Sequence, residues 1–322
     1  MRTRKRLGIG CAAAMLALMS IGAAAEKPSD TANKHTVQAG DGKATAVLPE
    51  APSTLVREVV YNELHDHDVH GYWRYWIEKH GGQGTSVAEQ VETADGPVTR
   101  VQMTNGRPIS AAASEDEDRR LARMLSSPAE QAEHRKAYAD DEHRIGRILA
   151  LLPDAFLYEP ARQERLGDVA CWHMRFEPNP AYPAHSIEAR IFHAMTGDVW
   201  IGVESKRLVR LDGQLEENVD FGYGILGRLY KGGWFRLERT QVNANAMAGD
   251  WKTQRLEVHM QGRAMLFKTI ARETSEVRGG FTPVPAGMSL QQAVALVETG
   301  TEASARQPEN AVHAQPASLR RP

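Results

Sequence analysis

The chain has 322 residues, with 39 lysines and arginines against 41 aspartates and glutamates. Its 42% hydrophobic content, with only 2 cysteines and 27 glycines, excludes collagen-like, low-complexity and disulfide-stapled proteins and predicts a chain that buries its own core. The near balance of charges argues against a general nucleic-acid binder, which normally carries a basic surplus.

Residues 1–25 have the layout of a secretory signal peptide. They open with basic residues, continue without a charge and end in three alanines before Glu26. This layout predicts export and cleavage, with the periplasm as the compartment. Because the uncharged stretch is long, an uncleaved inner-membrane anchor is the alternative. Cleavage would leave Cys171 as the sole cysteine, so that no intramolecular disulfide could form.

Two terminal segments lack a repeating apolar face. Residues 26–52 are polar and rich in alanine, glycine and proline, and residues 300–322 are similar. Such composition is typical of disorder, which concentrates at chain ends. The folded domain is therefore predicted over residues 53–299.

The first part of this domain predicts a short helix followed by strands. Residues 55–64 suit a helix, and the aromatic run 72–77 suits a strand. Residues 87–93 and 98–104 flank Asp95-Gly96, a strong hairpin signal because both residues tolerate positive φ.

A helical insertion is predicted at about residues 114–152. Ser114 and Ser127 are each followed three residues later by glutamate, the reciprocal capping arrangement. They predict helices at about 115–126 and 128–152, the second ended by Pro153.

The rest of the domain predicts short strands and a closing helix. Alternation of Trp172, Met174 and Phe176 with polar neighbours indicates a strand with one oily face. Because the connections are too short for parallel crossovers, the strands must be mostly antiparallel. The further predicted strands are 187–193, 199–203, 206–211, 234–242, 255–260 and 264–270, and a last helix starts at Ser289.

These elements predict a mainly β protein with helices, built on a curved antiparallel sheet whose concave side the helices cover. A hollow that is lined by apolar side chains can hold an apolar ligand. The candidate lining residues are Trp172, Met174, Phe176, Ile191, Trp200 and Phe235, and plain core packing is the alternative for each.

A histidine cluster raises the possibility of a metal site. His65, His67 and His70 are interleaved with aspartates, and such side chains can bind zinc or another divalent ion. No HExxH or similar motif supports a metal-dependent hydrolase, so a solvated polar turn is the simpler interpretation. No catalytic residue and no cofactor are predicted.

Several segments between about residues 55 and 298 form a recognisable series: VVYNELHDHDVHGYWRYWIEK, NGRPIS, LLPDAFLY, FEPNP, IEARIFHAM and KRLVRLDGQLEENVDFGYGILGRLYKGG. This series resembles a group of exported, uncharacterised bacterial proteins related to outer-membrane lipoprotein-sorting (LolA-like) carriers. The resemblance implies an unclosed β-barrel with helices as a lid over an apolar cavity that holds acyl chains. It supplies no catalytic residues, and no carrier motif maps residue by residue onto this chain.

The expected function is that of a periplasmic carrier that shields a lipid or an acylated protein, without catalysis. The alternative is an envelope interaction or stress-sensor protein in which the sheet edge or the helical pair binds a protein partner. Basic segments at 206–210 and 228–239 would allow peripheral contact with anionic lipid heads, although a solvated strand face is the ordinary explanation for them.

Overall fold

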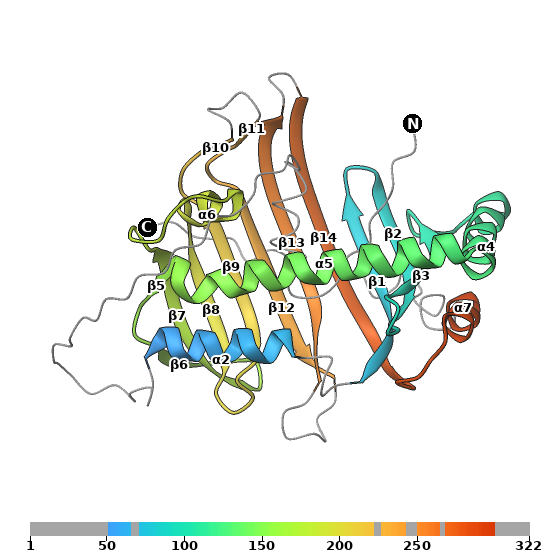
Figure 1. Cartoon of the computed structure of the whole chain (residues 1–322), viewed down its shortest axis with the longest axis horizontal. Helices are drawn as coiled ribbons and strands as arrows, with labels where there is room; N and C mark the ends of the chain where they lie inside the picture. Colours follow the sequence, from blue (N-terminus) through green and yellow to red (C-terminus); the bar gives the residue numbers. More distant parts are fainter. Residues whose placement is uncertain (1–50, 66–70, 222–226, 243–249, 265–267, 300–322) are drawn as a thin grey trace. The chain divides into compact units, whose positions relative to one another are not determined.

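The computed structural model describes residues 51–65, 71–221, 227–242, 250–264 and 268–299 (Figure 1). The predicted signal peptide, the predicted leader up to residue 50 and the predicted tail from residue 300 lie outside these residues. Residue 52, which the leader was predicted to include, is the first residue of a helix.

The described residues form five helices and fourteen strands. The helices are α2 (Pro52–Leu64), α4 (Ala111–Ser126), α5 (Pro128–Ala155), α6 (Ile187–Phe192) and α7 (Leu290–Thr299). The strands are β1 (Tyr72–Gly81), β2 (Gly84–Val91), β3 (Val98–Thr104), β4 (Arg107–Pro108), β5 (Phe156–Tyr158), β6 (Arg162–Leu166), β7 (Val169–Pro178), β8 (Met195–Gly202), β9 (Leu208–Leu215), β10 (Val219–Phe221), β11 (Gly227–Leu229), β12 (Trp234–Gln241), β13 (Trp251–Ala264) and β14 (Lys268–Val284).

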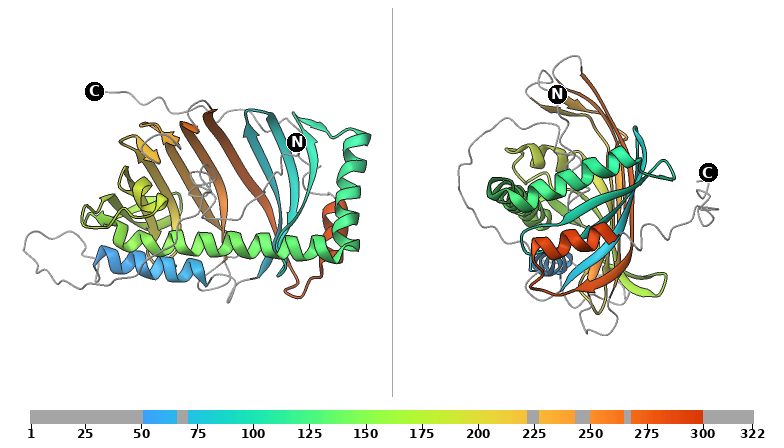
Figure 2. Two further views of the ribbon diagram at one scale, coloured as in Figure 1. Left: turned by 45° about the horizontal axis from the view of Figure 1, so that its top comes forward. Right: turned by 90° about the vertical axis from the view of Figure 1, so that its right-hand side faces the viewer.

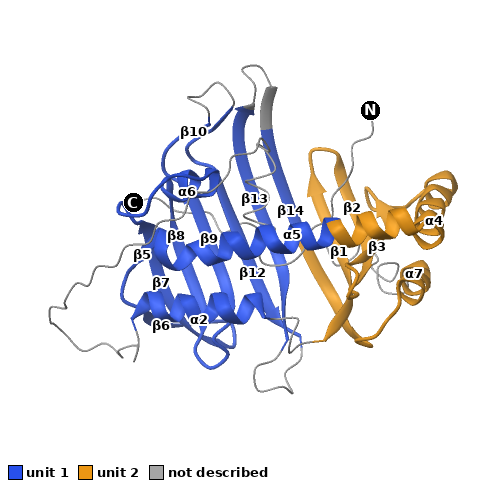
Figure 3. Cartoon of the chain, in the orientation of Figure 1, with its two compact units in different colours: residues 1–70, 137–276 blue, residues 71–136, 277–322 orange. Residues whose placement is uncertain are grey.

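The chain divides into two compact units (Figure 3). Unit 1 comprises residues 1–70 and 137–276, and unit 2 comprises residues 71–136 and 277–322. In unit 1 the strand order is β14-β13-β12-β9-β8-β7-β5, and in unit 2 it is β4-β3-β2-β1 with β14 next to β1. The pairs are antiparallel and the sheet is not closed, which confirms the predicted mainly β fold class with an open antiparallel sheet.

Two helical segments cover one face of the unit 1 sheet. Figures 1 and 2 show α2 and the C-terminal part of α5 lying side by side along that face. Apolar residues three and four apart on each helix pack against alternate residues of the strands, which places them in one core. The core includes Leu55, Val56, Val59 and Val60 of α2, Ile145, Ile148 and Leu149 of α5, and Trp172, Met174 and Phe176 of β7.

A pair of facing glycines lets two aromatic rings approach the backbone of the strands of unit 1 closely. Gly197 of β8 and Gly213 of β9 are cross-strand partners. A Cβ on Gly197 would lie 2.6 Å from the Phe176 ring and 2.0 Å from the Asp212 carbonyl oxygen, and a Cβ on Gly213 would lie 2.4 Å from Phe235. Both positions therefore need glycine because ring and backbone occupy the space of a side chain.

The strand predicted at 187–193 is wrong, because this segment forms the short helix α6. Ser186 accepts a hydrogen bond from the Ala189 amide at 3.1 Å, which caps the helix. In a run of six residues, apolar positions two apart and three or four apart overlap, so periodicity alone does not separate strand from helix.

The helical insertion is confirmed, but its ends differ from the prediction. α4 begins at Ala111, and its cap is Ser110 rather than Ser114. α5 begins at Pro128 behind Ser127 as predicted, and it continues through Pro153 to Ala155. Pro153 has no N–H to donate to the carbonyl of Leu149, and the helix ends two residues later, where Asn179 donates to the carbonyls of Asp154 and Ala155.

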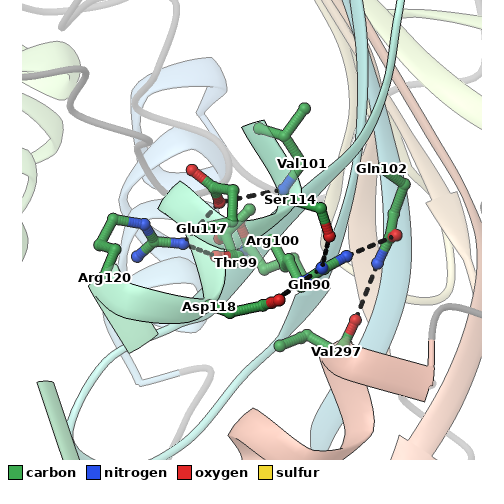
Figure 4. A network of polar contacts seen from close by, with 10 residues as sticks. All are labelled: Gln90, Thr99, Arg100, Val101, Gln102, Ser114, Glu117, Asp118, Arg120 and Val297. Atoms are coloured by element: carbon green, nitrogen blue, oxygen red, sulfur yellow. Dashed lines mark hydrogen bonds and ion pairs between the residues drawn. The ribbon is translucent and has the colours of Figure 1, made fainter. Parts of the chain in front are cut away.

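Unit 2 is held together by a small apolar core and a buried arginine. α4 and α7 pack on β2 and β3 through Val91, Val98, Leu121, Met124, Ala293, Val294 and Val297. Arg100 of β3 donates to Asp118 and Ser114 of α4 at 2.8 Å and to Gln102 at 3.0 Å, and Gln102 donates to the Val297 carbonyl of α7 (Figure 4). The Arg100 guanidinium thus links β3 directly to α4 and, through Gln102, to α7.

Replacing Gly197 by alanine is expected to lower the free energy of unfolding by about 1–3 kcal/mol, because the added methyl group overpacks a filled site. Denaturant titration measures the change. Gly82→Ala is the matched control, since nothing lies within 4 Å of a Cβ there, and it should change stability by less than about 0.5 kcal/mol. Equal effects of the two substitutions would contradict the assigned role of Gly197.

Candidate functional site

Unit 1 encloses an apolar cavity between α2, α5 and the sheet. Its volume is about 50 Å³. The lining residues come from α2, α5, β5, β7, β8 and β9, and they are Val56, Val59, Val60, Glu63, Leu149, Leu152, Phe156, Tyr158, Phe176, Val199, Ile201, Leu208 and Leu211. Glu63 is the one residue among them with a formal charge. Apart from Glu63 near the C-terminal end of α2 and the hydroxyl group of Tyr158, the lining is aliphatic or aromatic.

Glu63 interrupts the apolar stripe of α2. Val56, Val59, Val60 and Glu63 follow the spacing that places residues on one helix face, so the carboxylate points where an apolar side chain is expected. The Glu63 side chain is only 5% exposed. Burying a carboxylate is costly unless it is paired, so partners must come from the sheet.

Two buried arginines supply those partners. Arg239 of β12 donates from Nη1 to Glu63 Oε2, and Arg207, just before β9, places Nη1 3.8 Å from Glu63 Oε1. The side chains of Arg239 and Arg207 are 5% and 4% exposed. We refer to Glu63, Arg207 and Arg239 as the buried ion cluster. Its charges are shielded from water, so their attraction is strong and the removal of one member is costly.

The buried ion cluster also holds the C-terminal end of α2. Arg207 Nη1 donates to the Asn62 carbonyl at 2.5 Å, and Asn62 Nδ2 donates to the Lys206 carbonyl at 3.0 Å. A helix C-terminus carries partial negative charge and unpaired carbonyls, so a cation there is stabilising and a lone Glu63 would be destabilising. Lys206 adopts a φ of 50°, which turns the chain and directs Arg207 to this helix end.

An open groove of about 430 Å³ adjoins the cavity in unit 1. Phe156 and Tyr158 line both spaces and so separate them. Tyr158 donates from its hydroxyl to the Leu152 carbonyl at 2.8 Å, and burial raises its pKa well above the usual range. These two neutral rings stand between the buried space and solvent. The remaining groove residues are Pro52, Ser53, Arg57, Pro153, Asp154, Leu157, Asn179, Ala181, Tyr182 and Pro183.

The structure gathers most of the predicted lining residues but not all of them. Trp172, Met174, Phe176, Ile191 and Phe235 belong to one core cluster, and Phe176 lines the cavity itself. Ile191 reaches that core from α6 rather than from a strand. Trp200 instead belongs to a separate cluster with Cys171, Val209 and Trp251.

Trp200 forms part of a polar arrangement. Its ring stacks on His173 with centroids 4.5 Å apart, and the Arg210 guanidinium lies 4.9 Å from the ring centroid. His173 lies 3.0 Å from Glu164 and 2.8 Å from Asp198. Arginines of the basic segments pair with acids in the same way: Arg210 and Arg236 both bind Asp212, and Arg228 binds Asp220. The carboxylates offset this basic charge locally.

Neither Cys171 nor the described part of the histidine cluster forms a catalytic or metal-binding arrangement. Cys171 is buried, and desolvation raises the pKa of its thiol, the opposite of what a thiolate nucleophile needs. His65 places Nδ1 2.8 Å from the Tyr61 carbonyl. His67 and His70 lie outside the described residues, so the structure decides neither for the possible metal site nor for the solvated turn that the sequence favours. No group of three potential metal ligands occurs elsewhere in the described part of the chain.

Known proteins resemble this chain only weakly, and only in their structures. No family model matches the chain, and no curated protein is similar to it. A DUF1329 family protein from Desulfovibrio piger superposes with a TM-score of 0.25 and 8% identity, over 77% of this chain and 100% of that chain. MucB, solved in complex with MucA(peri), gives a TM-score of 0.21 and 10% identity, over 70% of this chain and 98% of that chain. Superpositions this weak do not establish a shared fold.

None of the helices in the described ranges is long and apolar enough to cross a membrane.

Replacing Glu63 by glutamine is expected to lower the free energy of unfolding by about 3–5 kcal/mol, because two buried guanidinium groups lose their carboxylate. Urea titration measures the loss. Asp154→Asn is the matched control, since it removes the Arg57–Asp154 pair that also joins α2 to α5 but whose side chains are 56% and 57% exposed. That control should cost about 0–1 kcal/mol. A Glu63→Gln variant as stable as the control would contradict the role of the buried ion cluster.

Proposed function

We propose that this protein is an exported, periplasmic binding protein that shields an apolar ligand, a lipid or the acyl chains of a protein, beneath α2 in unit 1. The largely apolar cavity carries the proposal, because close-packed protein interiors seldom leave unfilled space among apolar side chains. The predicted signal peptide supports export. The proposal includes no catalytic step.

The size of the cavity sets a condition on binding. At about 50 Å³ it is smaller than the roughly 300–1,000 Å³ of typical ligand pockets. An acyl chain can enter only if α2 or the rings of Phe156 and Tyr158 move. The open groove beyond these rings provides the route from solvent. Binding removes apolar surface of the ligand and of the protein from water, and this burial stabilises the complex by about 25 cal/mol per Å².

A protein partner at the sheet edge is the second candidate function. In the described strand order β5 is the last strand of unit 1, and its Leu157 is 46% exposed. An open edge with an exposed apolar residue can pair with a strand of another chain. This alternative retains the envelope location and needs no cavity.

Filling the cavity is expected to abolish binding of an apolar fluorescent probe such as N-phenyl-1-naphthylamine. Val199→Phe introduces a ring into the cavity lining, whereas Val209→Phe adds the same ring to the Trp200 cluster. Both variants overpack a buried site at a cost of about 1–3 kcal/mol, so thermal unfolding checks that they are equally folded. In the titration, the affinity for the probe should fall at least tenfold in Val199→Phe and stay unchanged in Val209→Phe.

The native ligand can be sought directly. The protein is purified from its own cell envelope and its organic extract is analysed by mass spectrometry. The expected result is a stoichiometric apolar compound. A protein that is consistently free of lipid and takes up no apolar probe would rule out the carrier function and favour the edge-binding alternative.

A further inference from the structure

One oxygen of the buried ion cluster is left without a hydrogen bond. A carboxylate accepts through two oxygens, and Glu63 Oε2 is used by Arg239. Glu63 Oε1 is buried and accepts no hydrogen bond from the described protein groups. The nearest guanidinium nitrogen, Arg207 Nη1, lies 3.8 Å away, which is an ion-pair distance but not a hydrogen bond.

This oxygen belongs to the residue that supplies the only charge in the cavity lining. The other lining groups are aliphatic or aromatic, except the Tyr158 hydroxyl, which donates to the Leu152 carbonyl. A buried acceptor without a donor is destabilising, and within an apolar space the donor must come from whatever enters that space. Glu63 thus brings a buried acceptor oxygen without a donor to a cavity whose other lining residues carry no charge.

The charge of Glu63 selects among head groups. A ligand carboxylate or phosphate would face Glu63 as a like charge and could bind the arginines only by displacing it, which would leave a second carboxylate buried. A hydroxyl group donates to Oε1 without disturbing the pair between Glu63 and Arg239. A neutral donor is therefore the best match to this site.

We propose that the ligand is an apolar molecule with a terminal hydroxyl group, such as a long-chain alcohol or a sterol-like alcohol, whose O–H donates to Glu63 Oε1. This inference rests on the proposed function, since it assumes that the cavity of unit 1 opens to take an apolar ligand. It adds the chemical class of the head group and the residue that recognises it.

Displacement of N-phenyl-1-naphthylamine by three small ligands tests the proposal on the unaltered chain. Decanol and methyl nonyl ether are isomers of equal size, but only decanol donates a hydrogen bond, and decanoate adds a negative charge. Decanol is expected to bind more tightly than either of the other two ligands, by a factor of about ten or more, because only decanol donates a hydrogen bond to the buried acceptor.

Each outcome of this series has a distinct meaning. Equal affinities for decanol and the ether would overturn the hydroxyl proposal and leave the apolar carrier intact. Tightest binding of decanoate would also overturn it and would assign an anionic head group to the arginines. Failure of all three ligands and the probe to bind would overturn the carrier function itself.

The Glu63→Gln variant provides a second test if it remains folded by circular dichroism. Its amide can donate to the ether oxygen, so the preference for decanol over the ether should fall to about threefold or less. Glu164→Gln is the matched control, because Glu164 pairs with His173 and Trp200 outside the cavity lining. The control should keep the full preference, and an equal loss in both variants would overturn the role of Glu63.

Discussion

A single carboxylate on the apolar face of α2 makes the position of that helix depend on two arginines of the sheet. The apolar side chains of α2 would bury equally well at several shifts along the sheet, because the hydrophobic effect is non-directional. Glu63 removes this freedom, since it is stable only where Arg207 and Arg239 reach it. The local backbone serves this match: Lys206 has positive φ, and a register shift of β12 against β13 lies beside Arg239.

The same residues connect stability to the proposed binding. α2 is held by apolar burial along its length and by the buried ion cluster at its C-terminal end. When α2 moves to admit an apolar ligand, the ligand covers the apolar side chains that α2 covered before. The apolar area exposed to water therefore changes little. The charged end can stay fixed while the apolar part moves. In the proposed carrier, α2 would therefore have a fixed C-terminal end and a releasable apolar part, with Phe156 and Tyr158 next to the groove.

Much of the architecture could be predicted because it depends on local patterns. Alternation in β7, the Asp95-Gly96 turn and the serine caps at Ser127 and Ser289 each act within a few residues, and the elements they predict are present. The errors have local causes too. α6 is too short for its period to be read, and two serines near the start of α4 compete for the cap, of which Ser110 is used. Trp200 lies in a separate cluster because its side chain points to the face of β8 opposite to Val199 and Ile201, which both line the cavity.

The sequence by itself determined most of the helices and strands, although not α6, and the antiparallel character of the sheet, since periodicity, turn chemistry and short connections suffice for these. The acid at Glu63 was visible in the stripe of α2, and an acid among apolar positions is the signal that could have indicated it. The partners of Glu63 could not be identified from the sequence, because Arg239 is 176 residues away along the chain. Nothing in the sequence distinguishes it from the other arginines until the strands are placed. Only the tertiary structure decided which charges are buried together and that the space beneath α2 is small, because both depend on packing between segments distant in sequence.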